Sequence, residues 1–237
     1  MQKKINSGGP PKEDPAHTRD RLLEAGLEVF GEYGYGGATT RLLAERARVN
    51  LAAIPYHFGG KEGLYQAVVT QIAGRVRQRL DPLLAEIGSA RRSGATDAAA
   101  ALVLLERLLA ALVEFIVGTP EAARFSHIVL REQLSPSAAY AIVFERIMQP
   151  LMEALAALVA AAGGGTVVGP WQRLQAMTLL GQVLVFRFGR ETAVRGLGMS
   201  GYSAEETAAI RDVVLAHTRA IVTSAVVPPG QAEGEQA

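Results

Sequence analysis

Residues 39–65, TTRLLAERARVNLAAIPYHFGGKEGLY, decide how the first part of this chain folds. Thr39 can cap a helix, because its hydroxyl can accept a hydrogen bond from a free N–H group of the first turn. Leu43, Ala44 and Ala47 then form one apolar stripe, with small side chains where a second helix must come close. The stretch therefore begins with a short helix that packs against a neighbour through small residues.

A turn and a second helix follow in the same stretch. Val49 is expected to be buried in the turn, and Asn50 is a strong N-cap for a helix over residues 51–57. Apart from Ile54, that helix has little to bury. A short, weakly apolar helix held against a longer one is typical of a recognition helix, whose outer face stays free for the major groove of DNA. The pattern therefore predicts a helix-turn-helix.

The residues of this motif resemble the DNA-binding region of TetR-type transcriptional repressors. That family combines a capped helix, an Ile/Leu-Ala pair, a turn ending in Val-Ser or Val-Asn, a helix ending in Tyr-x-Phe, and Lys-Glu-x-Leu. Here the matching residues are Thr39, Arg41, Leu43-Ala44, Val49-Asn50, Tyr56-His57-Phe58 and Lys61-Glu62-Gly63-Leu64. Residues 52–65 are most similar to the CerR-like branch of the family.

The resemblance implies a sequence-specific transcriptional regulator that binds a double-stranded, palindromic DNA operator as a homodimer and is released by a small-molecule effector. The residues implied to meet the DNA are Thr39, Thr40, Arg41, Arg48, Asn50, Leu51, Ala52, Ala53, Pro55, Tyr56, His57 and Lys61. We expect Thr40, Tyr56 and Lys61 to contact phosphates, and Arg41 to give most of the discrimination together with thymine methyl groups. Residues 51–57 include no Arg, Lys, Gln or Glu, so bidentate readout of guanine is not expected from this helix.

Three residues depart from the family pattern. Arg48 stands where the turn usually has glycine, so either an L-residue adopts a left-handed backbone at a cost of about 1 kcal/mol or more, or the turn has another shape. Leu42 stands where many relatives have Asp. Pro55 replaces a residue that is often polar or aromatic, and it removes one i→i−4 hydrogen bond from a very short helix.

Composition excludes several other classes of protein. The chain has 237 residues, of which 49% are hydrophobic, and no strand signal or internal repeat stands out. It has no cysteine, so disulfides and thiolate metal sites are excluded. No apolar run is suited to span a bilayer and the N-terminus is too polar for a secretory signal, so we expect a cytoplasmic protein without a membrane partner. The net charge is only +1, so any basic surface for DNA must be local to residues 41–61.

The sequence predicts an all-α protein with an N-terminal three-helix helix-turn-helix domain and a larger helical regulatory and dimerisation bundle. The expected parts are a disordered tail at 1–16, the DNA-binding domain at 17–65, the effector-binding and dimerisation domain at 66–225, and a disordered tail at 226–237. Thr18 is expected to cap the first helix and Gly34 to begin its end. The helix that starts at Gly60 is expected to stop near Leu80, before a loop at 87–97.

Caps and helix breakers place the later helices. They are expected at 98–117, 121–133 and 137–162, the last of them kinked at Pro150. Pro170 then opens a helix at its first turn, and Ser203 with Glu206 forms a capping box for the last helix.

The last two helices carry more apolar surface than one face of a small bundle needs. Two apolar stripes run along residues 171–190, so we expect one side of that helix to face its own chain and the other to face a second copy. A fully intrachain core is the alternative. The residues expected at the dimer interface are Leu174, Thr178, Gly181, Val185, Phe188, Ile210, Val213, Val214, His217 and Ile221.

An unknown small-molecule effector is expected between the middle helices, where apolar side chains and a few polar ones could form a pocket. The residues assigned to it are Phe115, His127, Arg131, Tyr140, Phe144, Met148, Trp171 and Arg187, with Phe125 and Phe186 as further candidates beside them. Arg131 and Arg187 stand in apolar helices and need a partner, which could be a carboxylate such as Glu132 or an anionic effector.

Two other functions compete with this one. His127, Glu132 and Glu145 could suggest a metal or hydrolytic site, but the chain has no Glu-x-x-His pair, nucleophile elbow or phosphate loop. We therefore expect no enzyme activity, no catalytic residues, no metal and no cofactor. The second alternative is a dimeric DNA-binding protein without an effector, which a solid core with no cavity would favour.

Overall fold

The computed structural model describes residues 15–93 and 97–223. Within these ranges every regular element is a helix, so the predicted all-α fold is confirmed. The predicted tails at 1–16 and 226–237 lie almost wholly outside the described residues. The chain divides into two compact units, Met1–Gln71 and Ile72–Ala237, and the predicted domain boundary at residue 65 lies just before this division.

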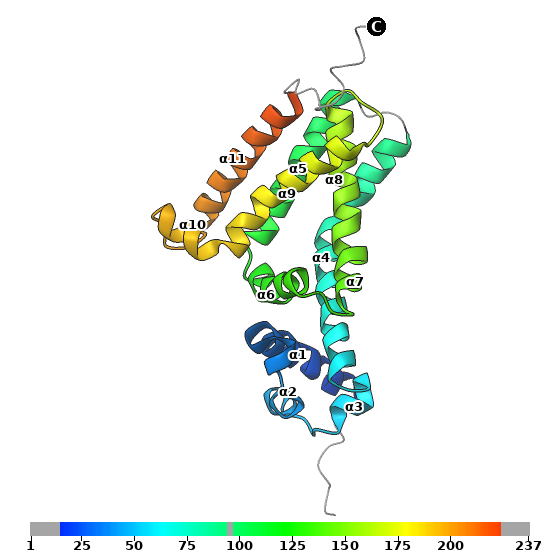
Figure 1. Ribbon diagram of the computed structural model, residues 1–237, viewed down its shortest axis with the longest axis vertical. Helices are drawn as coiled ribbons and strands as arrows, with labels where there is room; N and C mark the ends of the chain where they lie inside the picture. The colour runs from blue at the N-terminus through cyan, green and yellow to red at the C-terminus, as the bar shows by residue number, and fades with distance from the viewer. Residues whose placement is uncertain (1–14, 94–96, 224–237) are drawn as a thin grey trace, which may run out of the picture. The chain divides into compact units, whose positions relative to one another are not determined.

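The first unit is a three-helix arrangement completed by the start of a fourth helix. It contains α1 (Pro15–Gly37), α2 (Thr40–Ala47), α3 (Ala53–Phe58) and the beginning of α4 (Lys61–Arg92), drawn from blue to cyan in Figure 1. Each of the four helices contributes fully buried side chains to one core: Leu22, Phe30, Leu43, Ile54 and Leu64. The core therefore joins the helix-turn-helix to α1 and to the base of α4.

The start of α1 differs from the prediction. The helix begins at Pro15, so Thr18 is not its cap but a residue of its first turns, and its side chain is buried. The prediction for the other end was closer: Gly34 has φ 69° and ψ 176°, a conformation that interrupts the helix and that only glycine adopts readily.

Helix α4 is longer than predicted. It continues past Leu80 to Arg92, with Pro82 inside it, and the loop expected at 87–97 is helical in its first part. Ile87 is 1% exposed and belongs to the core of the second unit, with Leu83 and Leu84 packed against that core. Burial of these side chains compensates for the hydrogen bond that Pro82 cannot donate. The periodicity of the sequence does not reveal this burial.

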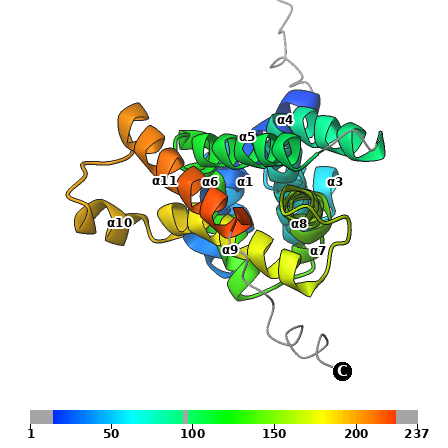
Figure 2. The same cartoon turned by 90° about the horizontal axis from the view of Figure 1, so that it is seen from above.

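The second unit is a bundle built around α5. Its helices after α4 are α5 (Ala98–Ile116), α6 (Pro120–Leu134), α7 (Tyr140–Val143), the π-helical turn η1 (Phe144–Met148), α8 (Gln149–Ala162), α9 (Pro170–Phe188), α10 (Arg190–Gly196) and α11 (Ala204–Thr223). Helix α5 packs against α8 and α11, and α9 packs against α8, α5 and α11 (Figures 1 and 2). The core between them is mostly leucine: Leu105, Leu108, Leu109, Leu155, Leu158 and Leu179.

Most of the predicted helix ends in this unit are confirmed. Thr119 caps α6, and its hydroxyl oxygen accepts from the Ala122 N–H at 3.1 Å. The Ser203 N–H donates to Glu206 at 2.7 Å and the Glu206 N–H donates to Ser203 at 3.2 Å, which is the predicted capping box. The backbone hydrogen bond at the Ser203 N–H is also the first cause that holds the pKa of Glu206 below its usual value.

Two features of the bundle differ from the prediction. The interruption before Pro150 is a wide π turn rather than a simple kink, because Pro150 has no N–H for the regular ladder. Helix α10 was missed, since it buries none of its residues and so has no apolar period to detect.

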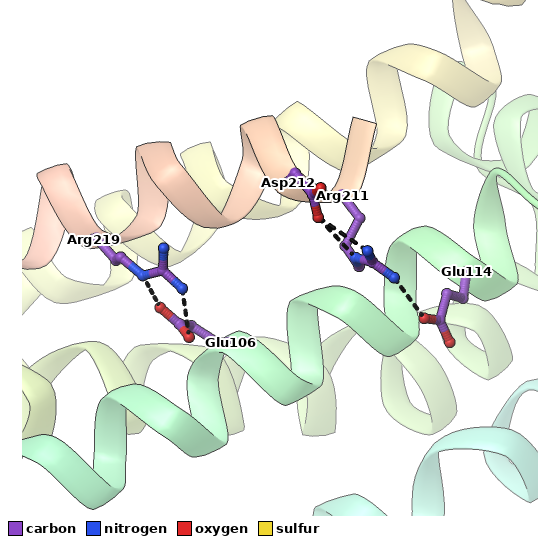
Figure 3. A network of polar contacts seen from close by, with 5 residues as sticks. All are labelled: Glu106, Glu114, Arg211, Asp212 and Arg219. Atoms are coloured by element: carbon purple, nitrogen blue, oxygen red, sulfur yellow. Dashed lines mark hydrogen bonds and ion pairs between the residues drawn. The ribbon is translucent and has the colours of Figure 1, made fainter. Parts of the chain in front are cut away.

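Ion pairs hold α11 against α5 along one flank (Figure 3). The Arg219 guanidinium meets Glu106 at 2.5 Å and 3.1 Å, and Arg211 lies 3.6 Å from Glu114. Asp212 also accepts from Arg211, at 3.0 Å. Arg211, Asp212 and Arg219 all take part in this network, and Asp212 is also exposed to solvent.

Candidate nucleic-acid interface and interior cavity

The N-terminus of α2 is built as the sequence predicts. Thr39 has an extended backbone, and its hydroxyl oxygen accepts from the Leu42 N–H at 3.1 Å. Leu43, Ala44 and Ala47 are buried, and α2 contacts α1 and α3. This leaves Thr40 and Arg41 at the start of α2 on the surface, with Arg41 paired to Glu45 at 3.0 Å.

Arg48 takes the first of the two alternatives for the turn. It has φ 55° and ψ 46°, and it is the only described non-glycine residue with positive φ. Its N–H donates to the Glu45 carbonyl and the Val49 N–H donates to that of Ala44, each at 3.0 Å, which ends α2 in a left-handed cap. Val49 is half-buried, so it is less enclosed than predicted.

Arg21 supports the same turn from α1, and sequence reasoning missed it. Its Nε donates to the Ala47 carbonyl at 2.8 Å, and its Nη2 donates to the Arg48 carbonyl. These are carbonyls at the end of α2 that the helix itself leaves without donors. An arginine on a separate helix has no local pattern that would reveal this role.

Asn50 caps a turn that leads into α3. Its side-chain oxygen accepts from the Ala52 N–H at 2.8 Å, and its carbonyl accepts from the Ala53 N–H at 2.9 Å. The helix proper then runs from Ala53 to Phe58, slightly later than predicted. The carbonyl of Leu51, which would have accepted from residue 55, accepts from the Ile54 N–H at 3.3 Å, so Pro55 leaves no gap in the turn.

Residues of α2, the turn and α3 border one shallow hollow. It is bordered by Thr40, Asn50, Leu51, Ala52, Ile54, Pro55 and Gly60. Five of the residues predicted to meet DNA therefore lie together, from α2, the turn and α3. Tyr56 is 80% exposed at the end of α3, with the ring of His57 edge-on to it at 4.8 Å. Ala53 and His57 are half-buried and present less surface.

Lys61 differs from its expected role as a free phosphate contact. Its ammonium donates to the carbonyls of Tyr35 and Ala38, at 2.9 Å each, and lies 4.3 Å from the centre of the Tyr35 ring. These contacts join the start of α4 to the end of α1. Lys61 is thus a structural residue of the first unit, whatever it also contributes to DNA.

Gly63 explains the glycine in the Lys-Glu-x-Leu motif. A Cβ atom at this position would lie 1.9 Å from the carbonyl oxygen of Phe58, which no side chain can tolerate. The end of α3 and the start of α4 therefore approach each other closely, with Gly59 and Gly60 in positive-φ conformations between them.

A cavity of about 80 Å³, partly open to the surface, lies in the second unit. Its walls come from α4, α5, α6, α9 and the η1–α8 segment, and its lining is Val76, Leu80, Leu112, Phe115, Ile116, Ala122, Phe125, Ser126, Val129, Ile147, Met148, Leu151, Leu180, Leu184, Arg187 and Phe188. Of the residues assigned to an effector, it brings together Phe115, Met148 and Arg187, and the further candidate Phe125 also lines it.

Five of the assigned effector residues lie away from this cavity, and these assignments are corrected. On α6, Ala122, Phe125 and Val129 face the cavity, so His127 and Arg131 fall on the opposite, exposed side of the helix. Phe144 is 44% exposed, while Tyr140 and Trp171 are half-buried outside the lining. Phe186 packs against the core without reaching the cavity. The periodicity placed all of these on helices correctly, but not on the right face.

Arg187 is the one charged residue of the lining. Its Nε donates to the Ile116 carbonyl at 2.6 Å, and its Nη2 donates to those of Val117 and Thr119 at 2.9 Å and 3.3 Å. Burial lowers the pKa of Arg187 from its ordinary value. Its partner is therefore the carbonyl end of α5 rather than Glu132, whose carboxylate accepts from the Ser137 N–H and hydroxyl at 3.0 Å.

The structure splits the residues assigned to a dimer interface into two groups. Leu174, Thr178, Gly181, Val185, Val213 and His217 are exposed on α9 and α11. Ile210 and Val214 are buried in the chain's own core, Ile221 packs against that core, and Phe188 borders the cavity. The second group is corrected to intrachain packing, because it lies on the inner faces of the two helices.

Among the described residues, no helix combines the length and apolar character that crossing a membrane requires. The same residues contain no cluster of three or more His, Asp or Glu side chains that could hold a metal ion.

Comparison with known families agrees with the helix-turn-helix and the bundle. Residues 22–68 match the family described as bacterial regulatory proteins, tetR family, and residues 101–224 match the C-terminal domain of the HTH-type transcriptional dual regulator CecR. The chain therefore belongs to the TetR family of transcriptional regulators, which bind DNA and are not enzymes. The sequence alone had indicated a CerR-like branch, whereas the model that matches residues 101–224 is described as CecR.

Individual relatives fit the same assignment. The HTH-type transcriptional dual regulator CecR of Shigella flexneri is 34% identical over 200 residues, which cover 84% of this chain and 89% of that protein. A putative fatty acid metabolism regulator of Clostridium perfringens has a similar fold, with a TM-score of 0.61, 16% identity and coverage of 84% and 96% of the two chains. AibR in complex with isovaleryl coenzyme A and operator DNA also has a similar fold, with a TM-score of 0.60, 14% identity and coverage of 84% of this chain and 97% of that one.

Proposed function

We propose that this regulator is a repressor that binds a palindromic operator as a homodimer, in the cytoplasm, and leaves it when a small molecule occupies the cavity of the second unit. The observation that carries the proposal is that Val76 and Leu80 of α4 form part of the cavity wall. Helix α4 also begins at Lys61, directly after the helix-turn-helix. Helix α4 thus has residues both in the cavity wall and directly after the helix-turn-helix, as ligand-released repression requires.

The dimer surface proposed here is the apolar flank of α9 and α11. Leu174, Met177 and Val185 of α9 are 55–56% exposed and Val213 of α11 is 52% exposed. No Asp, Glu, Lys or Arg stands between Leu174 and Val185 on α9. On α11, Arg211 and Arg219 reach Glu114 and Glu106 of α5, while the exposed Asp212 beside Val213 pairs with Arg211 of the same helix (Figure 3). An exposed apolar surface is typical of a protein–protein interface. His217 bridges the two helices at its edge, 3.0 Å from the Gln182 side chain.

Coupling between the cavity and α4 is proposed to pass through α6. Glu121 at the start of α6 lies 4.0 Å from Arg75 and 3.6 Å from Arg79, both on α4. Arg75 also lies 5.9 Å from the ring centre of Phe125, which borders the cavity. A ligand that moved α6 would therefore pull on α4 through charged as well as apolar contacts. A ligand acts only by binding the two states unequally, and a coupling of about 1–3 kcal/mol changes operator affinity about 5–150-fold.

The proposal is tested by a footprint of the purified protein on the DNA that flanks its own gene, combined with light scattering. We expect two protected half-sites related by a two-fold axis, about 34–36 Å apart or somewhat more, and a dimer at micromolar concentration. A monomer that binds a single half-site tightly would contradict the proposal.

A second candidate is a dimeric DNA-binding protein with no effector. The observation in its favour is the size of the cavity, since 80 Å³ is far below the roughly 300–1,000 Å³ of ordinary ligand sites. Filling the cavity with Ser126→Leu separates the two candidates in a reporter strain. A ligand-released repressor loses its response to the inducing growth condition, whereas a regulator without an effector responds as the parent does.

A further inference from the structure

The hollow beside α3 has a mainly apolar surface. Leu51 is 51% exposed, Ala52 and Pro55 are also exposed, and the buried Ile54 borders the same hollow. Leu51 and Pro55 are four residues apart, so they lie on the same side of this helical turn. The surface offered to a partner is therefore formed mostly by carbon atoms.

Hydrogen-bonding side chains contribute little to this hollow. Thr40 and Asn50 are the polar residues among those described at its border, and none of these border residues is charged. The Asn50 side-chain oxygen already accepts from the Ala52 N–H at 2.8 Å. Arg41 does not border the hollow, and its guanidinium lies 3.0 Å from the Glu45 carboxylate. Readout of a base edge by side-chain hydrogen bonds is therefore poorly supported within the hollow.

Among the DNA bases, thymine suits such a surface best. In the major groove, adenine, guanine and cytosine present hydrogen-bond donors and acceptors, whereas thymine also presents its 5-methyl group. An apolar wall against the other base edges would remove water from polar atoms without replacing their hydrogen bonds, which is unfavourable. Burial of the thymine methyl group against the same wall is favourable.

We infer that the hollow is a thymine-recognition site, in which the 5-methyl group of a thymine in the major groove packs against Leu51, Ala52 and Pro55. The hollow lies within residues 22–68, which match the family model of these DNA-binding regulators. Its volume of about 550 Å³ and its wide opening to solvent allow the methyl-bearing edge of a base to enter. The inference rests on operator binding, which is part of the proposed function, and names the chemical group of the operator that is recognised.

Deoxyuridine in place of thymine tests the inference on the unaltered, full-length protein. This exchange removes the 5-methyl group and keeps the base pair and its hydrogen-bonding edge. In the operator located by footprinting, thymines are exchanged one symmetric pair at a time, and affinity is measured by fluorescence anisotropy. We expect one pair, or two neighbouring pairs, to weaken binding by about 15-fold each, because burial of one methyl group contributes about fourfold and a homodimer buries two. Exchange of the other thymines should leave the affinity unchanged.

Methylated cytosine separates recognition of the methyl group from recognition by hydrogen bonds. Replacing the sensitive T·A pairs by C·G should weaken binding at least as much as deoxyuridine does. With 5-methylcytosine at the same positions, most of this loss should be recovered, because its methyl group stands where the thymine methyl stood. A protein that recognised the thymine oxygen by hydrogen bonding would not distinguish cytosine from 5-methylcytosine.

Two leucine variants locate the contact on the protein. Leu51→Ala removes the largest exposed apolar side chain of the hollow, so the deoxyuridine exchange should weaken this variant by only about fourfold or less. Leu134→Ala is the matched control, because Leu134 is 74% exposed on α6 in the second unit, and it should keep the full 15-fold loss of the parent. Thermal unfolding checks that both variants are folded, and the deoxyuridine series on the parent decides the matter if Leu51→Ala is not.

The inference is overturned if no thymine of the operator is sensitive to the exchange, if 5-methylcytosine recovers nothing, or if Leu51→Ala keeps the full loss. Each of these results is obtained on a protein bound to its operator, so the proposed function would stand. A protein that protects no DNA would overturn both the proposed function and the inference. Operator binding with the expected thymine dependence, but without release under any inducing condition, would contradict ligand-released repression alone.

Discussion

The helix-turn-helix and the bundle reach defined structures by different means. In the first unit, single residues fix the backbone at set positions: Thr39 caps α2, Arg48 turns the chain, and Gly63 lets α3 and α4 approach. In the second unit, long apolar stretches ensure that the segments are helical, while packing decides which side of each helix is buried. Substitutions should therefore have sharp, position-specific effects in the first unit and effects that depend on the helix face in the second.

The largest effect is expected from two glycines of the same helix. Gly63→Ala places a methyl group 1.9 Å from the Phe58 carbonyl oxygen and should destabilise the first unit by about 3 kcal/mol, with loss of operator binding. Gly74→Ala is the matched control, because nothing lies within 4 Å of the place that its methyl group would occupy, and it should stabilise the protein by up to about 1 kcal/mol. Thermal unfolding of both variants measures the difference, and equal behaviour would mean that α3 and α4 are not closely packed.

The next effect concerns the apolar flank of α9 and α11. Val185→Glu should weaken the dimer by about 2 kcal/mol, or about 30-fold, because a two-fold interface would contain the new charge twice. Val103→Glu on α5 is the control, since Val103 and Val185 are 55% and 56% exposed. Sedimentation at a series of concentrations gives both dissociation constants. If the two variants dimerise equally well, the interface lies elsewhere.

A smaller effect is expected at the turn. Arg48→Gly removes the cost of a left-handed L-residue and should stabilise the first unit by about 1 kcal/mol. If Arg48 also contacts a phosphate, the same variant should bind DNA more weakly and reduce the slope of log affinity against log salt by about one. Increased stability with an unchanged salt slope would assign Arg48 a purely conformational role.

The smallest change in stability is expected for Arg41→Ala. Within residues 15–93 and 97–223, Arg41 is paired only with Glu45, on an exposed helix surface, so its removal should alter the free energy of unfolding by about 0.5 kcal/mol or less. The effect of Arg41→Ala on DNA binding should be larger, with reduced discrimination between operator and unrelated sequences in competition binding.

Lys61→Ala should behave in the opposite way: it should lower the unfolding temperature through the lost Tyr35 and Ala38 contacts and weaken binding to all sequences alike.

These residues also show how far the sequence could be interpreted. The Thr39 cap, the capping box at Ser203 and the helix opened by Pro170 act within four residues of the chain, so their residue types alone predicted them. The error in α4 arose because Pro82 was outweighed by burial of Ile87, a contact with distant segments. Helix α10 had no apolar period and so left no signal.

The candidate sites show the same limit. Five of the residues expected at the DNA border one hollow, because one short motif contains them. It assigned eight residues to an effector, of which the cavity brings together Phe115, Met148 and Arg187. A rotation of a helix by less than half a turn separates a lining residue from an exposed one, and helical period alone does not fix that rotation.

By itself, the sequence determined that this chain is helical and where most of its caps and turns lie, because apolar periodicity and hydrogen bonds between near neighbours decide both. The TetR-type helix-turn-helix was indicated by the resemblance of residues 39–65 to that family. The tertiary structure decided which faces of α9 and α11 stay exposed, that Arg21 supports the turn at Arg48, and that Arg187 holds the end of α5 beside an apolar cavity. Those contacts join residues far apart in the chain, and they depend on how whole helices pack rather than on any local pattern.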